Sequence, residues 1–317
     1  MLVTVAIPCY NSSQTLETVV SDIKKQFADK PDYDYQIVLV NDNSKDNTFE
    51  VIERLCEKDS KITGVDLSKN YGQVSAQMAA IRFIKGDIAV FMDDDGQHPA
   101  DELFKLVESV EAGNDLVYAC FPNKKHSFFK RITSKLNSKL LEWTNRKPKG
   151  IKLSSYFALS SVSIKALRKY RSPYPSIGGY LLQITRRVVN VEVTHRERIA
   201  GNSNYTLKKM ITLWLQGFTN FSIAPLRVAS FMGVFSACVG LIGGLILIIQ
   251  KLCNPNMAVG YTSIMAAVLF VGGLLMLMIG ILGEYIGRMY ILLSNMPQFN
   301  IRDSLNADDE KEDMYEQ

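Results

Sequence analysis

Apolar positions divide the chain of 317 residues into two parts with different patterns. In the first part, short apolar runs typical of buried strands alternate with segments whose apolar residues recur every three or four positions, as in helices that face a core. The predicted strands cover residues 2–7, 36–40, 62–67 and 87–92, and the predicted helices cover residues 15–27, 46–58 and 74–84. Continuous apolar strands separated by helices predict an α/β fold with a mostly parallel sheet covered on both faces.

Polar loops follow three of these strands, at residues 8–11, 41–44 and 93–97. The carboxyl ends of parallel strands meet at one edge of the sheet, and ligands of such folds bind there. We therefore expect the three loops to form one binding site.

Two long uncharged stretches mark the second part of the chain. No Asp, Glu, Lys or Arg occurs at residues 228–250 or 252–283, and only Lys251 stands between them. A helix of about 20 residues crosses the hydrocarbon core of a bilayer, which predicts two spans and excludes both a wholly cytosolic protein and a multi-span transporter. The predicted division is an α/β domain (1–205), an interfacial amphipathic segment (206–227), transmembrane helices (228–250 and 257–283), and a juxtamembrane segment with an acidic tail (284–317).

Charge predicts the orientation of the two spans. Lys208, Lys209 and Arg227 precede them and Arg288 follows them. Because basic residues stay on the cytoplasmic side of a membrane, both large ends of the chain are predicted to be cytoplasmic, with the protein in the inner (cytoplasmic) membrane. The five cysteines form no CxxC pair, which is typical of reduced thiols.

The net charge of +4 conceals a strongly basic segment. Residues 121–152 hold ten bases and one acid, whereas residues 302–317 hold seven acids and two bases. The basic segment fits anionic lipid headgroups or phosphates. A solvated helix face is the alternative interpretation.

Three consecutive carboxylates, Asp93, Asp94 and Asp95, follow the strand at residues 87–92. Alternation along an extended chain sends Asp93 and Asp95 to one side and Asp94 to the other. Two carboxylates on one side repel each other unless a cation or donor lies between them. Oxygen ligands favour Mg²⁺ or Mn²⁺, and the phosphates of a nucleotide typically complete the coordination shell of these ions. An acidic loop that caps the next helix is the alternative.

Asp42 follows the second strand and is a candidate acceptor for a base or a ribose, with a turn-forming role as the alternative. The sequence contains no GxxxxGK[ST] phosphate loop, and no GxGxxG follows the first strand. A P-loop site is therefore excluded, and a dinucleotide site loses its main support.

Four motifs resemble, in order, those of the family-two glycosyltransferases with the GT-A (Rossmann-like) fold. They are residues 6–11 (AIPCYN), 40–44 (VNDNS), 70–73 (NYGQ) and 93–99 (DDDGQHP). The C-terminal half is similar to the polyprenyl-phosphate sugar transferases, which include bactoprenol glucosyltransferases and undecaprenyl-phosphate 4-deoxy-4-formamido-L-arabinose transferases. That similarity rests on residues 195–205 (HRERIAGNSNY), 221–227 (FSIAPLR), the two predicted spans and residues 283–288 (GEYIGR).

The resemblance implies an inverting transfer of one sugar from a nucleotide-diphospho-sugar, a UDP-sugar by default, to polyprenyl (undecaprenyl) phosphate. The transfer would occur at the cytoplasmic membrane face and serve the modification of cell-envelope glycans. The implied partners are the donor, the lipid acceptor and the membrane, without nucleic acid, and a homo-oligomer, a tetramer in the family.

The resemblance also implies roles for individual residues. The nucleotide-sugar-binding residues would be Pro8, Tyr10, Asn11, Asp42, Asp94 and Gln97. Asp93 and Asp95 would hold a divalent metal, Mg²⁺ or Mn²⁺, and would form the catalytic set with Arg198. Arg198, Ser203 and Tyr205 would bind the lipid phosphate.

The chain departs from the family pattern at two places. The Asp and Arg that members often carry near residues 151–158 are absent, and residues 121–123 (FPN) stand where an Arg usually follows the fifth strand. One interpretation is an enzyme that relies on positioning and metal; the other is a catalytically degenerate, membrane-anchored nucleotide-sugar-binding or scaffold protein. A processive polysaccharide synthase is disfavoured because the chain has no QxxRW motif and only two predicted spans.

Overall fold

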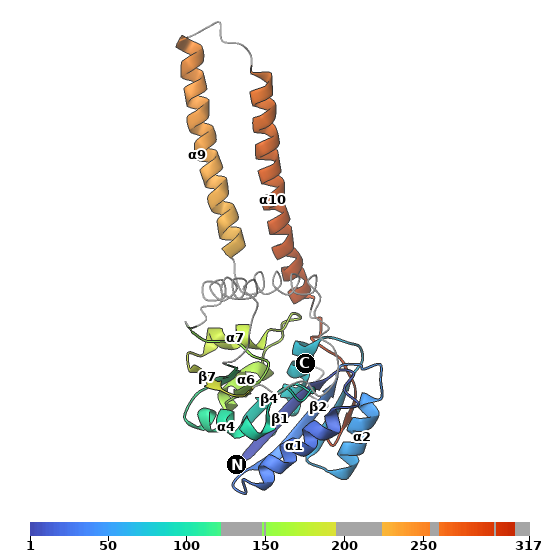
Figure 1. Cartoon of the computed structure of the whole chain (residues 1–317). Coiled ribbons are helices and arrows are strands. Elements are labelled where there is room, and N and C mark those ends of the chain that lie inside the picture. Colours follow the sequence, from blue (N-terminus) through green and yellow to red (C-terminus); the bar gives the residue numbers. More distant parts are fainter. Residues whose placement is uncertain (122–147, 149, 195–223, 254–259, 295, 308–317) are drawn as a thin grey trace. The chain divides into compact units, whose positions relative to one another are not determined.

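The computed structural model describes residues 1–121, 148, 150–194, 224–253, 260–294 and 296–307 (Figure 1). The chain forms two units, one comprising Met1–Ile211 with Pro297–Gln317 and the other Thr212–Met296. The first unit is an α/β domain, and the second contains a pair of long helices.

The α/β domain is built on a sheet with the strand order β7-β5-β6-β4-β1-β2-β3-β8. Strands β6 and β8 run against all the others, which are parallel to one another. The strands are β1 (Leu2–Cys9), β2 (Asp34–Asn41), β3 (Ile62–Leu67), β4 (Ile88–Phe91), β5 (Leu116–Cys120), β6 (Phe157–Leu159), β7 (Val188–Glu192) and β8 (Ile301–Leu305). The helices are α1 (Leu16–Ala28), α2 (Thr48–Lys58), α3 (Gln73–Phe83), the short 3₁₀ helix η1 (Ala100–Glu102), α4 (Leu103–Glu111), α6 (Ser161–Arg168) and α7 (Ile177–Ile184).

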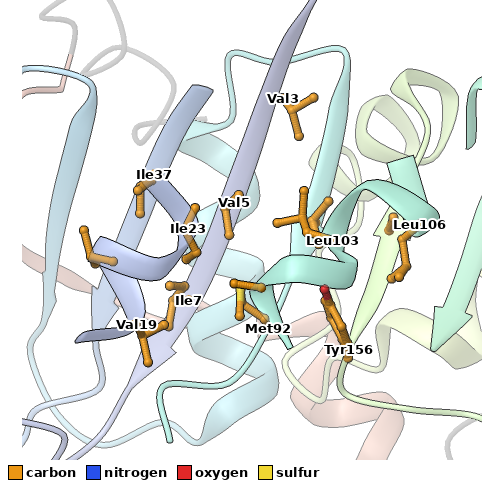
Figure 2. Close-up of a cluster of buried hydrophobic side chains, with 14 of the residues drawn as sticks. Val3, Val5, Ile7, Val19, Ile23, Ile37, Met92, Leu103, Leu106 and Tyr156 are labelled. Carbon is orange, nitrogen blue, oxygen red and sulfur yellow. The ribbon is translucent and has the colours of Figure 1, made fainter. Parts of the chain in front are cut away.

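Alternate residues of β1 face two helix layers, because successive side chains of a strand point to opposite faces. One layer contains α1, α2 and α4, and the other contains α3, α6 and α7. Ala6 faces the second layer. Figure 2 shows Val3, Val5 and Ile7 of β1 in the first layer's cluster, with Val19 and Ile23 of α1 and Leu103 and Leu106 of α4.

The seven predicted strands and helices are all present, as β1 to β4 and α1 to α3. The predicted fold class, a mostly parallel α/β sheet, is confirmed. The sequence pattern did not anticipate β8, which lies within the segment 284–317 and pairs antiparallel with β3. Its residues Arg302, Asp303 and Ser304 are exposed, so this edge strand lacks the apolar alternation that reveals a buried one.

The second unit contains α9 (Ala224–Cys253) and α10 (Tyr261–Leu293). Among the described residues, one stretch, Phe270–Leu293, is long and apolar enough to cross a membrane, with a mean hydropathy of 1.8. Exposed apolar side chains occur on both helices, for example Phe235 and Phe270. The two spans at 228–250 and 257–283 stay predictions, and residues 254–259 lie outside the described part of the chain.

Gly86 provides a test of the packing between the amino ends of β1 and β4. A Cβ atom at this position would lie 2.7 Å from the Leu2 carbonyl oxygen and 2.8 Å from the Thr4 nitrogen, and these backbone atoms are fixed in the sheet. We expect Gly86→Ala to reduce the free energy of unfolding by about 1–3 kcal/mol, the usual cost of overpacking. The measurement is the thermal unfolding midpoint of the detergent-purified protein.

The matched control is Asp87→Ala, because Asp87 is the next residue and is exposed. This substitution keeps the backbone hydrogen bond from Asp87 to Leu2 and should leave the midpoint almost unchanged. Equal midpoints for the two variants would contradict the close approach.

Candidate active site

Three loops meet at the carboxyl edge of the sheet, as the parallel topology predicts. The Tyr10 backbone N–H donates to Asp94 Oδ2 (3.0 Å), which joins the loop after β1 to the loop after β4. The Asn11 N–H donates to Ser44 Oγ (3.0 Å), and Asn11 Oδ1 accepts from the Lys45 N–H (2.8 Å), which joins the loop after β1 to the loop after β2. These contacts join the three predicted loops, and they include three predicted site residues, Tyr10, Asn11 and Asp94.

The loops after β1 and β2 turn sharply. Asn11 has φ 55° and Asn43 has φ 52°, in the left-handed region that Asn tolerates better than most residues. Pro8 and Tyr10 differ in exposure: Pro8 is buried in β1 opposite Val40, whereas the Tyr10 side chain is 37% exposed. Of these two predicted binding residues, Tyr10 is accessible and Pro8 is buried in the sheet.

Asp42 fixes the loop that precedes α3. Its Oδ1 accepts from the Tyr71 N–H (2.7 Å) and its Oδ2 from the Gly72 N–H (2.8 Å). Gly72 has φ 91°, which a glycine adopts without steric cost. Burial raises the pKa of Asp42, while the two N–H donors lower it. The Asp42 carboxylate therefore orders the loop that holds Tyr71 and Gly72.

Neighbouring side chains hold the Asp93 carboxylate. Gln73 Nε2 donates to Asp93 Oδ1 (2.7 Å), and Ser155 Oγ donates to Asp93 Oδ2 (2.9 Å). His98 Nδ1 accepts from the Asp93 N–H (2.9 Å), and His98 Nε2 lies 3.6 Å from Asp93 Oδ2. The buried His98 ring stacks on Tyr156, with centroids 4.8 Å apart. Asp93 is thus oriented by α3, by the segment before β6 and by its own loop.

Asp94 contacts other neighbours than Asp93 does, and it lies in a turn rather than in the extended chain predicted from the sequence. Its Oδ2 accepts from Tyr10, and its carbonyl oxygen accepts from Thr15 Oγ1 (2.6 Å) at the start of α1. Burial raises the pKa of Asp94 to about 6. In this structure Asp94 joins the acidic loop to the loop after β1, and its predicted contact with the nucleotide sugar stays a prediction.

The acidic loop fits a divalent ion that also binds substrate oxygens. Asp95 Oδ1 accepts from the Gln97 N–H (3.0 Å), which orients a second carboxylate two residues from Asp93. Within the described ranges no group of three His, Cys, Asp or Glu side chains is arranged around a metal position. Mg²⁺ is usually bound by one or two carboxylates together with substrate phosphates and water. Two aspartates fit this chemistry, and their role as metal ligands stays a prediction.

β7, the last described strand before the segment predicted to bind the lipid phosphate, ends at the same edge of the sheet. β7 is parallel to β5 and ends at Glu192, opposite Cys120, and the next N–H, of Val193, donates to the Cys120 carbonyl (3.0 Å). Thr194 then binds the Glu102 carboxylate through its N–H and its hydroxyl. Arg198, Ser203 and Tyr205 lie outside the described residues, as do residues 122–147 of the basic segment.

Four side chains of the site did not emerge from the sequence: Gln73, His98, Glu102 and Ser155. Gln73 and His98 belong to motifs that the resemblance uses, but no pattern paired them with Asp93. Ser155 lies 62 positions from Asp93, and Glu102 lies 92 positions from Thr194. Only the fold brings such residues together.

Comparisons with known proteins identify the family of the chain. The family model "Glycosyl transferase family 2" matches residues 4–169, and the model "GtrB C-terminal hairpin" matches residues 224–289. An undecaprenyl-phosphate 4-deoxy-4-formamido-L-arabinose transferase of Edwardsiella ictaluri is 33% identical over 98% of this chain and 96% of the relative. A bactoprenol glucosyl transferase of Shigella phage SfII is 29% identical over 96% of this chain and 98% of the relative.

Solved structures share the fold of the α/β domain. Mannosyl-3-phosphoglycerate synthase from Rubrobacter xylanophilus has a TM-score of 0.51 at 16% identity, over 72% of this chain and 74% of that one. Glucosyl-3-phosphoglycerate synthase from Mycobacterium tuberculosis, in complex with Mn²⁺, uridine diphosphate and phosphoglyceric acid, has a TM-score of 0.50 at 19% identity, over 68% and 75% of the two chains. The predicted GT-A fold and the predicted resemblance are both confirmed. The chain belongs to glycosyl transferase family 2 and carries the C-terminal hairpin of the GtrB type.

Proposed function

We propose that the protein transfers one sugar from a nucleotide-diphospho-sugar, a UDP-sugar, to undecaprenyl phosphate, with inversion at the sugar carbon. The reaction takes place at the cytoplasmic face of the inner membrane and serves the modification of cell-envelope glycans. The observation that carries this proposal is the convergence of the loops after β1, β2 and β4 at one edge of the sheet, in a chain that also has the GtrB-type hairpin. The names of relatives that span nearly the whole chain support the acceptor.

The loops after β1 and β2 form the donor side of the site. Tyr10 has an exposed ring that suits stacking on a base, and Asn11 is held at its turn by Ser44. Asp42 orders the loop before α3 through Tyr71 and Gly72. These contacts hold the loops in one arrangement, and an ordered binding loop lowers the entropy cost of binding.

The acidic loop lies on the diphosphate side. Asp93 and Asp95 would hold Mg²⁺ or Mn²⁺, which supplies positive charge against the charge that develops on the leaving nucleotide diphosphate. Gln73 and Ser155 hold the Asp93 carboxylate in place through their hydrogen bonds. The chain's own contribution at this point is therefore a carboxylate held in one orientation.

Tyr156 lies in the segment where family members often carry an Asp, but it cannot act as a general base in place of that Asp. Its hydroxyl donates to the Pro99 carbonyl (3.0 Å), and burial raises the pKa of Tyr156 far above its usual range. A phosphate monoester has a second pKa of about 6 and is already largely anionic near neutral pH. The acceptor needs little deprotonation, so positioning can replace a dedicated base.

The membrane arrangement is part of the proposal. α9 and α10 would be the two spans, with the α/β domain and the C-terminus in the cytoplasm and the basic segment 121–152 near anionic lipid. The lipid acceptor would then reach the site from the inner leaflet. A homo-oligomer, a tetramer as in the resembled family, completes the proposed state.

The alternative is a nucleotide-sugar-binding or scaffold protein without turnover, favoured by the missing Asp and Arg near residues 151–158. One assay gives different results for the transferase and for the scaffold protein. The purified protein is mixed with undecaprenyl phosphate and a panel of radiolabelled nucleotide sugars, and label in organic-extractable lipid is counted. Nucleotide-sugar binding without labelled lipid would support the scaffold.

Asp95→Asn tests the metal assignment. The amide is a weaker metal ligand than the carboxylate, and we expect the rate of transfer to undecaprenyl phosphate to decrease by at least about 100-fold. The melting temperature should stay close to that of the wild type. The matched control is Asp101→Asn, an exposed aspartate of η1, which should transfer at the wild-type rate. Full activity of Asp95→Asn would refute Asp95 as a metal ligand.

Arg198→Ala tests the acceptor side. Arg198 follows Thr194, which Glu102 anchors, by four positions, and the arginine fork suits phosphate because it donates two parallel hydrogen bonds. We expect the KM for undecaprenyl phosphate to rise at least about tenfold, with the KM for the donor unchanged. Arg171→Ala, an exposed arginine after α6, is the control. An acceptor KM equal to that of the control would refute the assignment.

A further inference from the structure

The chain that follows the hairpin returns to the α/β domain and is firmly seated there. Gln298 Nε2 donates to the Tyr170 carbonyl (2.9 Å), and the buried Phe299 ring lies under the Arg82 guanidinium at 4.9 Å. β8 then pairs with β3. Asn306 Nδ2 donates to the Cys56 and Ile62 carbonyls, each at 2.9 Å. Residues 297–307 are therefore a structural part of the sheet.

Arg302, on β8, contacts two points at the end of β3 with one guanidinium group. Its Nη1 lies 3.2 Å from Asp66 Oδ2, and its Nη2 donates to the Ser68 carbonyl (2.9 Å). The Asp66 side chain is 6% exposed, whereas that of Arg302 is 56% exposed. A buried carboxylate needs such a partner, because removal of the cation leaves a desolvated charge.

The first contact leads to the loops on the proposed donor side. Asp66 Oδ1 accepts from Asn41 Nδ2 (2.6 Å), and Asn41 Oδ1 accepts from the Ser44 N–H (3.1 Å). Ser44 Oγ in turn accepts from the Asn11 N–H (3.0 Å). A continuous series of hydrogen bonds thus joins Arg302 to both turns with positive φ, at Asn11 and Asn43.

The second contact leads to the loop before α3. The Ser68 hydroxyl lies 3.1 Å from the Tyr71 hydroxyl, and the Tyr71 and Gly72 N–H groups bind Asp42. Asp42 itself follows Asn41 in the chain. The two contacts of Arg302 therefore converge on the turn at residues 41–44, one through Asp66 and one through Ser68.

We propose that Arg302 is a positioning residue for donor binding, which makes the segment after the hairpin a part of the nucleotide-sugar site. Arg302 acts by holding Asp66 and Ser68, and through them the turn at residues 41–44 and the loop at residues 68–72. The inference rests on the proposed function, because it assumes that these loops bind the donor. It assigns no contact between Arg302 and the substrate.

The test compares Arg302→Ala with Arg54→Ala in the full-length protein in detergent. Arg54 forms an exposed ion pair with Glu17 at 3.5 Å, so the control removes the same side chain and one ion pair. With the nucleotide sugar that the wild type uses, we expect Arg302→Ala to raise the donor KM about tenfold, as for loss of one charge-assisted contact. The kcat and the acceptor KM should remain close to the wild-type values. Arg54→Ala should change none of the three.

Two further measurements separate positioning from general stability. Arg302→Lys keeps the charge opposite Asp66 but lacks the fork that reaches Ser68, so its donor KM should lie between those of the wild type and Arg302→Ala. Hydrogen exchange should be faster in Arg302→Ala for peptides that cover residues 40–46 and 68–73, and unchanged in Arg54→Ala. If Arg302→Ala does not fold, Arg302→Lys carries the test, with a donor KM raised and an acceptor KM unchanged.

The failure of this inference differs from the failure of the proposed function. An active wild type whose donor KM is unchanged in Arg302→Ala and Arg302→Lys would overturn the positioning role and leave the transferase intact. Equal changes in both KM values and in kcat would also overturn it, because they indicate a general loss of structure. A wild type that neither transfers sugar nor binds UDP would instead refute the proposed function.

Discussion

The parallel pairing of β1 with β2 on one side and with β4 on the other is the constraint on which the site depends. In this register Cys9 lies opposite Asn41, so the loops after β1 and β2 leave the sheet at the same level. β4 pairs with β1 up to Ala6 and Phe91, and the Met92 N–H still donates to the Ala6 carbonyl. The three aspartates therefore follow directly beside the first two loops. A shift of one residue in either pairing would turn every side chain of the strand to the other face.

This arrangement brings several carboxylates to one edge of the sheet, and each of them accepts hydrogen bonds from its own donors. Asp42 accepts hydrogen bonds from two backbone N–H groups. Asp93 accepts them from the side chains of Gln73 and Ser155, and Asp94 accepts one from the Tyr10 N–H. Like charges in one site disfavour ionisation, and the separate partners reduce this effect by holding Asp93 and Asp94 toward different elements. The loops are ordered by the same bonds. The same hydrogen bonds therefore hold the carboxylates toward different elements and order the loops.

The sequence alone predicts those strands and helices whose pattern of apolar residues is local. β1 to β4 are continuous apolar runs, and the position of the three loops follows from their parallel order. β6 has three residues and β8 is mostly exposed, so neither has a recognisable period. The contacts of Ser155 with Asp93 and of Arg302 with Asp66 join residues 62 and 236 positions apart. Such pairs depend on how β6 and β8 add to the sheet, which no local pattern encodes.

The hairpin lies in the sequence between the two edge strands of the sheet. β7 forms one edge and β8 the other, and the residues between them in sequence include α9 and α10. Thr194, the last described residue before α9, is bound to Glu102, which follows the acidic loop in the sequence. The chain returns to the α/β domain at residues 297–307, where Arg302 holds the end of β3. The exposed charged residues Arg302 and Asp303 of β8 also disfavour pairing of this edge strand with other chains. The hairpin is therefore inserted between a segment next to the proposed acceptor loop and a segment that shapes the proposed donor side.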